Sequence, residues 1–175
     1  MKILVTGTAG FIGMHLVHTL AEQGHEVFGL DNINAYYDVQ LKYDRLRETG
    51  IDARSGIPGE WITSTRYPAY RFVQMDLCDK EALDRLFRTE HPEAVVNLAA
   101  QAGVRYSTEN PEAYVDSNVM GFLHLLECCR RYPVKHLVYA SSSSVYGLNE
   151  KPPFPKTIVP IVPPACMPLP KKQTR

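Results

Sequence analysis

Along residues 1–147, short β-branched apolar runs alternate with longer amphipathic stretches. The runs are almost continuously apolar, which is typical of strands that helices cover on both faces of a sheet. This order predicts repeated strand–helix–strand units and therefore a parallel sheet. The strands are expected at Lys2–Thr6, Glu26–Asp31, Tyr70–Asp76, Ala94–Ala99 and His136–Ser141.

Helices are expected between these strands, where apolar residues recur at helical spacing. One covers about Phe11–Gln23 and stops at Gly24, and another covers about Lys80–Thr89. The clearest helix covers Pro111–Arg131, with Asn110 as its N-cap. Its apolar stripe consists of Val115, Val119, Phe122 and Leu126.

Two segments depart from this alternation. Residues 51–68 contain Gly56, Pro58, Gly59 and Pro68 and are expected to form a loop insertion before the third strand. Eight of the 13 prolines lie between residues 152 and 170, a density that excludes helix and central strand. The fold class is therefore α/β, a doubly wound Rossmann-type parallel sheet over residues 1–150, followed by an irregular proline-rich tail over residues 151–175.

Composition narrows the possible partners. Lys plus Arg and Asp plus Glu number 19 each, so the net charge favours neither nucleic acid nor an anionic membrane. The four cysteines show no CxxC spacing, and no metal site is expected. The start MKILVTGTAGFIG has the pattern of a strand and a glycine turn instead of a signal peptide, and no run of 18 apolar residues occurs. A cytoplasmic protein is expected.

A glycine turn follows the first expected strand and opens the first expected helix. It reads Gly7-Thr8-Ala9-Gly10-Phe11-Ile12-Gly13. Spaced glycines alone are a weak signal, but between a strand and a helix they are typical of a dinucleotide-binding turn. The helix N-terminus would supply N–H groups to a pyrophosphate. The alternative is a glycine turn without function.

Asp31 closes the second expected strand, 18 residues beyond Gly13. A carboxylate at this place accepts hydrogen bonds from the adenosine ribose and repels a 2′-phosphate, which favours NAD over NADP. The alternative is a solvated turn aspartate before Asn32.

Further motifs resemble the extended short-chain dehydrogenase/reductase family. They are Asp76-Leu77, Asn97-Leu98-Ala99-Ala100, Asn118 and the segment SSSSVYG at residues 141–147. More narrowly, DNINAYYD at residues 31–38 with Leu41-Lys42, and AAQAGVRYS at residues 99–107, look like UDP-glucuronate 4-epimerases. The resemblance extends over residues 1 to about 154.

The resemblance implies roles for individual residues. Asp76 would contact the adenine, Ala99 and Ala100 would line the cofactor near the nicotinamide ribose, and Ser142 would hydrogen-bond the sugar hydroxyl that is oxidised. Ser143 and Ser144 would face a UDP-sugar substrate, and Arg105 would meet an anionic part of it. Four serines after a strand can also be an ordinary polar turn. The expected cofactor-binding residues are Gly7, Gly10, Phe11, Ile12, Gly13, Asp31, Asn32, Asp76, Leu77, Leu98, Ala99 and Ala100.

The family performs reversible hydride transfer with a tyrosine base, which belongs to a Tyr-x-x-x-Lys pair one helical turn apart. This sequence contains no such pair, because Tyr139 is followed four residues later by Ser143 and Tyr146 by Glu150. By comparison with the family, the resemblance also implies that the Rossmann domain at residues 1–150 is incomplete and that a substrate domain is missing.

A shifted reading frame of the tail can encode the missing Tyr-x-x-x-Lys pair. When possible codons of residues 154–175 are read one base earlier, they can encode SEDNRTDSPASLYAATKKANE, which contains Tyr-Ala-Ala-Thr-Lys. Two bases of every shifted codon are fixed by this sequence, so accident is a poor explanation of the agreement. We therefore interpret the chain from Pro155 onward as frameshifted, and the alternative is a genuine proline-rich tail.

Two functional hypotheses follow. The chain is a catalytically inactive N-terminal part of an NAD-dependent nucleotide-sugar epimerase, or it is a non-catalytic NAD(H)-binding sensor or interaction module. A sensor module should be soluble and should bind NAD(H). The resemblance implies a homodimer formed through the long helix and a second helix that this sequence lacks. An inactive part should therefore expose the stripe of Val115, Val119, Phe122 and Leu126 and associate through it.

Overall fold

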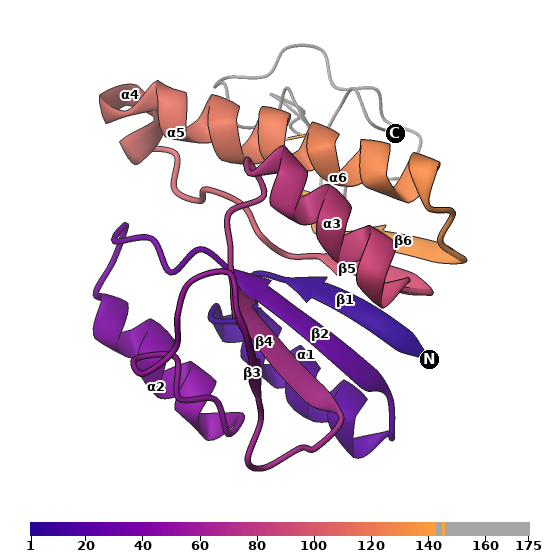
Figure 1. The fold of residues 1–175 in the computed structure, drawn as a ribbon. Helices are drawn as coiled ribbons and strands as arrows, with labels where there is room; N and C mark the ends of the chain where they lie inside the picture. The colour runs from indigo at the N-terminus through magenta and orange to yellow at the C-terminus, as the bar shows by residue number, and fades with distance from the viewer. Residues whose placement is uncertain (143–144, 146–175) are drawn as a thin grey trace, which may run out of the picture.

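A computed structural model describes residues 1–142 and Val145 (Figure 1). Its centre is a six-stranded sheet in the order β3-β4-β2-β1-β5-β6. All neighbouring strands are parallel except β3 and β4. The expected α/β doubly wound fold is therefore confirmed. The strands are β1 Lys2–Thr6, β2 Glu26–Asp31, β3 Trp61–Thr63, β4 Tyr70–Gln74, β5 Ala94–Asn97 and β6 His136–Tyr139.

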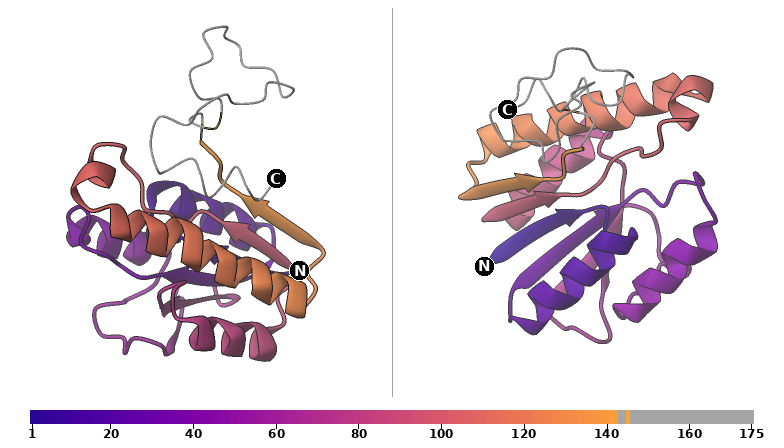
Figure 2. Two further views of the ribbon diagram at one scale, coloured as in Figure 1. Left: turned by 90° about the horizontal axis from the view of Figure 1, so that it is seen from above. Right: turned by 180° about the vertical axis from the view of Figure 1, so that it is seen from behind.

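Helices cover both faces of the sheet (Figures 1 and 2). On one face, α1 (Phe11–Glu22) and α2 (Val39–Glu48) pack over a core that includes Val17 and Leu46. On the other face, α3 (Lys80–Glu90) and α6 (Phe122–Arg131) enclose a second apolar core. Covering on both faces explains why the central strands are almost continuously apolar.

The strand order reverses beside β1. From β1 the chain proceeds outward to β2 and β4, and it then returns to the other side of β1 with β5 and β6. Thr6 at the end of β1 is consequently in register with Leu30 of β2 and with Asn97 of β5. In such sheets, ligands bind outside the carboxyl ends of the strands at this reversal.

Several local signals are confirmed. β1 and β2 have the expected bounds, and the other three expected strands end two residues earlier than predicted. Gly24, which follows α1, has a φ of +79° and ends the helix in the left-handed conformation. Asn110 caps the segment that begins at Pro111, because its side-chain oxygen accepts a hydrogen bond from the Ala113 N–H at 3.3 Å.

The prediction of one continuous helix over Pro111–Arg131 was wrong in one respect. The helix consists of α5 (Pro111–Val115), the π-helical turn η1 (Asp116–Gly121) and α6. A π turn holds an extra residue and rotates the residues that follow it. Gly121 permits a close approach at this point, since a Cβ there would lie 2.9 Å from the Leu77 Cβ.

The extra residue also changes the expected apolar stripe. Phe122 is buried in the second core and Leu126 packs against that core, so neither is available on the outer face. Val115 and Val119 are exposed as expected, and Leu123 is exposed beside them.

The prediction that residues 51–68 form only a loop was also wrong. Trp61–Thr63 forms β3, which pairs antiparallel with β4 at the edge of the sheet. Its aromatic and β-branched residues favour a strand despite the flanking glycines and prolines. Two helices were not predicted, α2 and the short α4 (Tyr106–Glu109).

The predicted tail at residues 151–175, together with Ser143 and Ser144, lies outside the described residues. Within the part of the chain that the structure describes, no helix is long and apolar enough to span a membrane.

Candidate functional site

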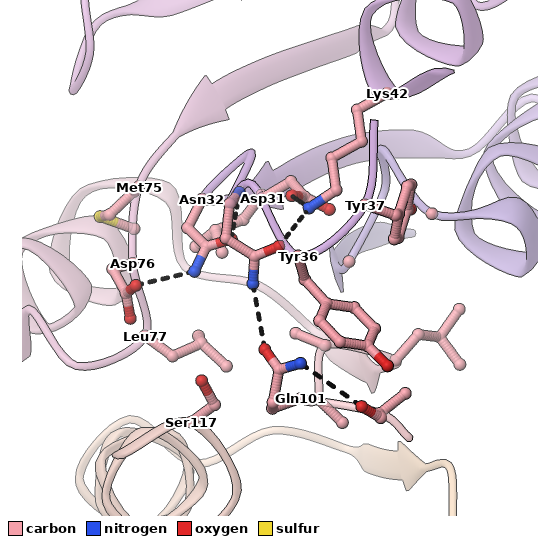
Figure 3. Close-up of a pocket in the computed structure, with 18 residues that line it drawn as sticks. Asp31, Asn32, Tyr36, Tyr37, Lys42, Met75, Asp76, Leu77, Gln101 and Ser117 are labelled. Carbon is pink, nitrogen blue, oxygen red and sulfur yellow. Dashed lines mark hydrogen bonds and ion pairs between the residues drawn. The ribbon is translucent and has the colours of Figure 1, made fainter. Parts of the chain in front are cut away.

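A cavity of about 160 Å³ opens at the carboxyl ends of the central strands, where the strand order reverses (Figure 3). The glycine turn after β1, the end of β2, the loop after β4 and the loop after β5 all contribute to its walls. This is the place where sequence reasoning put a cofactor. Most of the residues expected to bind it line the cavity, namely Gly7, Gly10, Asp31, Asn32, Asp76, Leu77, Leu98, Ala99 and Ala100.

The glycine turn is closely packed. Gly7 has a φ of +77°, and a Cβ on it would lie 2.8 Å from the Ala99 backbone nitrogen. A Cβ on Gly13 would lie 2.1 Å from the Gly7 carbonyl oxygen, so α1 approaches the turn as closely as backbone permits. Gly10 begins α1 as its N-cap, in an extended conformation and without a side chain at the mouth of the helix. This cradle fits the pyrophosphate of a dinucleotide, which needs a close backbone approach.

Phe11 and Ile12 occupy the first turn of α1 but do not line the cavity. Their side chains point to the surface and are 64% and 65% exposed. Only their backbone N–H groups, at the N-terminus of the helix, remain candidates for cofactor contact.

Asp31 is buried at the end of β2. One carboxylate oxygen, Oδ2, accepts a hydrogen bond from the Ala9 N–H at 3.1 Å, and Oδ1 accepts one from the Ile33 N–H at 2.8 Å. Burial raises the pKa of this carboxyl, while the nearby Lys42 ammonium and the two backbone N–H groups act in the opposite direction. The alternative of a solvated turn aspartate is wrong, because Asp31 is only 7% exposed.

Asn32 and Asp76 connect the ends of β2 and β4. The Asn32 amide donates to Asp76 Oδ2 at 2.8 Å, and the Cys78 N–H donates to Asp76 Oδ1 at 2.8 Å. Partial burial opposes ionisation of Asp76, but these hydrogen bonds outweigh it and hold the pKa below its ordinary value. The cavity therefore has a carboxyl group at the end of each of these two strands, and that of Asp76 is held in its ionised form.

The wall that follows β5 is fixed by a buried hydroxyl. Thr6 Oγ1 donates to Asn97 Oδ1 at 2.6 Å and accepts from the Ala99 N–H at 3.1 Å. Gln101, two residues further, exchanges hydrogen bonds with Asn118 of the π turn, at 2.9 Å through its N–H and at 3.0 Å through its carbonyl. The π turn thus holds the loop that carries Ala99 and Ala100.

Sequence reasoning missed part of the cavity wall. Asn34, Tyr36 and Tyr37 come from the loop after β2, and Lys42 comes from α2. Tyr36 and Tyr37 lie in a loop that faces the cavity (Figure 3). The available signal was Asp38, which caps α2 by accepting a hydrogen bond from the Gln40 N–H. That cap would have revealed the helix that carries Lys42.

The residues expected at the substrate lie apart from this cavity or outside the described residues. Arg105 is exposed at the start of α4 and does not line the cavity. Ser142 follows β6, and its carbonyl accepts a hydrogen bond from the Val145 N–H at 3.1 Å. Ser143 and Ser144 are not described. Among residues 1–142 and 145, no group of three or more His, Cys, Asp or Glu side chains could hold a metal ion.

Known proteins with similar sequences match most of this chain. "Protein CapI" of Staphylococcus aureus is 51% identical over 154 residues, which are 88% of this chain and 41% of that protein. UDP-glucuronate 4-epimerase 4 of Arabidopsis thaliana is 48% identical over 155 residues, which are 88% of this chain and 32% of that protein. The chain therefore spans less than half the length of these curated relatives.

A solved structure with the same fold is UDP-glucuronic acid 4-epimerase from Bacillus cereus, in complex with UDP-glucuronic acid and NAD. It has a TM-score of 0.80 and 28% identity, and the match covers 99% of this chain and 50% of that one. The NAD complex of UDP-glucose 4-epimerase from Thermus thermophilus has a TM-score of 0.75 and 35% identity, covering 99% of this chain and 48% of that one.

Residues 3–164 match the NAD dependent epimerase/dehydratase family, and this range contains the glycine turn, both carboxylates and every described wall of the cavity. The chain belongs to the NAD-dependent epimerase/dehydratase family.

Proposed function

We propose that this chain binds NAD in the cavity at the carboxyl ends of β1, β2, β4 and β5. The observation that carries the proposal is the contact between Gly13 and Gly7, which leaves room for backbone only and so forms the cradle that a pyrophosphate requires. Asp31 supports the same assignment. Each oxygen of its buried carboxylate accepts one backbone N–H and can accept a further hydrogen bond from a ribose hydroxyl. The adenosine end of the cofactor would lie along Asp31, Asn32 and Asp76.

The proposed lineage is a UDP-glucuronate 4-epimerase. The relatives that carry this name include one from Rhizobium meliloti, described as probable, which is 46% identical over 154 residues. In such an enzyme NAD supplies a reversible hydride acceptor for a sugar carbon. A UDP-sugar substrate and a homodimer are proposals for the whole protein, of which this chain spans only part of the length.

We further propose that the 175-residue chain does not catalyse epimerisation of a UDP-sugar. Proton removal from a sugar hydroxyl needs a base that is partly ionised near neutral pH. The hydroxyl of Ser142 can hold the substrate hydroxyl through a hydrogen bond, but an aliphatic alcohol cannot take its proton. The sequence contains no Tyr-x-x-x-Lys pair to do so.

Calorimetric titration with NAD and NADP tests the binding proposal. Wild-type protein should bind NAD at least about tenfold more tightly than NADP, because Asp31 repels a 2′-phosphate. The Asp31→Ala variant should lose most of this preference. Equal affinities of wild-type protein for the two cofactors, or no binding of NAD, would overturn the assignment.

A further inference from the structure

Lys42 extends from α2 into the wall of the cofactor cavity (Figure 3). Its side chain is only 6% exposed, which is rare for a lysine. The ammonium donates a hydrogen bond to Asn34 Oδ1 at 2.8 Å and lies 3.8 Å from Asp31 Oδ1. It also lies 5.1 Å from the centre of the Tyr37 ring, close enough for a cation–π contact.

These contacts leave donor capacity on Lys42. An ammonium has three N–H donors, and among residues 1–142 and 145 only Asn34 accepts one of them within hydrogen-bonding distance. The Asp31 oxygen at 3.8 Å forms an ion pair but lies beyond that distance. A buried cation with unused donors is costly unless something else accepts from it. Because Lys42 lines the cavity, a ligand in the cavity is the available acceptor.

Asp31 has the complementary capacity. Each of its oxygens accepts one backbone N–H, from Ile33 and from Ala9, and an ionised carboxylate offers about two acceptor sites on each oxygen. Lys42 and Asp31 therefore present a donor and an acceptor to the cavity side by side. A vicinal diol matches this arrangement, because each hydroxyl both donates and accepts.

We propose that Lys42 is a cofactor-contacting residue, and that Lys42 and Asp31 together bind the 2′,3′-diol of the adenosine ribose, the ammonium donating to a hydroxyl oxygen while the carboxylate accepts from a hydroxyl. This inference rests on the proposed binding of NAD. It assigns recognition of the ribose to a charge pair instead of to Asp31 alone.

The surroundings of the pair are consistent with this role. Burial lowers the pKa of Lys42, and the Asp31 carboxylate opposes that effect. The other charged groups that act on the pair are Arg45, which lowers the pKa of Lys42, and Asp76, which raises that of Asp31. Lys42 and Asp31 therefore each favour the charged form of the other, in opposition to the effect of burial.

The test compares cofactors that differ in a single hydroxyl. NAD and its two analogues, lacking either the 2′- or the 3′-hydroxyl of the adenosine ribose, are titrated calorimetrically into wild-type protein, Lys42→Met and Lys135→Met. Lys135 is the matched control, because it is 67% exposed and pairs with Glu93 away from the cavity. Loss of a hydrogen bond from a charged donor should weaken NAD binding by about 10- to 100-fold in Lys42→Met. For the analogue that lacks the contacted hydroxyl, the same substitution should cost less than about threefold.

Three outcomes overturn the inference. If Lys42→Met weakens NAD and both analogues by the same factor, Lys42 acts only through the fold or through Asp31. If it weakens none of them, Lys42 contacts no part of the cofactor. If wild-type protein fails to bind NAD, the proposed function fails first and this inference with it.

A further variant covers the case in which Lys42→Met does not fold, as circular dichroism would show. Lys42→Gln keeps an N–H donor of similar reach and should retain NAD affinity to within about tenfold of wild type, with a reduced dependence on the contacted hydroxyl. Wild-type protein should itself bind the analogue that lacks the contacted hydroxyl more weakly than it binds NAD. Equal binding of wild type to NAD and to both analogues overturns the inference without any variant.

Discussion

Gly13 lies against the carbonyl oxygen of Gly7 so closely that a Cβ on Gly13 would be 2.1 Å from it. The helix α1 and the turn that precedes it are therefore in backbone-to-backbone contact. This contact fixes the direction in which the N-terminus of α1 points toward the cavity.

Gly13→Ala should separate α1 from the turn. Overpacking of this kind costs about 1–3 kcal/mol of stability, and the displaced N–H groups should weaken NAD binding by about tenfold or more. Chemical denaturation and calorimetry measure the two effects. Gly24→Ala is a suitable control, because a Cβ there meets nothing within 4 Å and only its φ of +79° is strained. If Gly13→Ala binds NAD as wild type does, the cradle does not hold the pyrophosphate.

Asp76 should contribute stability that depends on pH. Its pKa in the folded protein is below the ordinary value of 3.8, so folding favours the ionised form. This contribution is fully present above about pH 4 and is lost as the pH falls through the folded pKa. Asp76→Asn should lower the free energy of unfolding by about 0.5–1 kcal/mol at pH 7, a value reduced by solvent screening, and by less at pH 3.

Urea denaturation at the two pH values measures the Asp76 effect, with the exposed Glu60→Gln as a control. An equal loss of stability at both pH values would contradict the assignment of the effect to the ionised carboxylate.

The exposed apolar face of the long helix should cause association. Val115 and Leu123 are 48% and 46% exposed, and Val119 lies between them at 36%. Contiguous apolar patches of this kind bind other surfaces. Light scattering at tens of micromolar, a rough range in which such association becomes visible, should detect oligomers or aggregates.

The double substitution Val115→Gln with Leu123→Gln should reduce this association. Val104→Gln should not, although Val104 is 56% exposed, because it lies in a separate turn before α4. A stable wild-type monomer under these conditions would show that the face needs no partner.

Insertion of one base, or deletion of two, at codon 154 should restore activity. The shifted frame can encode SEDNRTDSPASLYAATKKANE, which supplies a tyrosine and a lysine one helical turn apart. A missing general base alone costs a factor of about 10² to 10⁴. Incubation with UDP-glucuronate and NAD, followed by chromatographic separation of UDP-galacturonate, compares the two chains. Turnover by the 175-residue chain contradicts the proposed inactivity, and an early stop in the shifted frame contradicts the frameshift.

Much of the fold could be predicted because its signals are local. β1 and β2 are long apolar runs bounded by turn residues, so their ends could be placed to the residue. The existence of β3 could not be predicted, because a three-residue edge strand is too short to show periodicity. The π turn was missed because an apolar stripe is counted at α-helical spacing, and a single inserted residue moves Phe122 from the expected outer face into the core.

The residues of the site also fall into those that could be predicted from the sequence and those that could not. Asp31 and the glycine turn could be predicted, because their chemistry follows from adjacent elements of the sequence. The role of Lys42 could not, since it depends on α2 folding back toward Asp31. The segment KYDRLRE that forms most of α2 is mainly charged and gives only a weak amphipathic pattern.

The π turn has a consequence for how this chain can vary in length over evolutionary time. Each residue of an α-helix advances its neighbours by about 100°. A deletion within Asp116–Gly121 would restore regular α-helical bonding, but it would also turn Phe122 and the rest of α6 away from the second core. It would at the same time move Asn118 from the loop that it holds beside the cavity. Surface loops can gain and lose residues freely, whereas this π turn is a segment in which related sequences should keep their length.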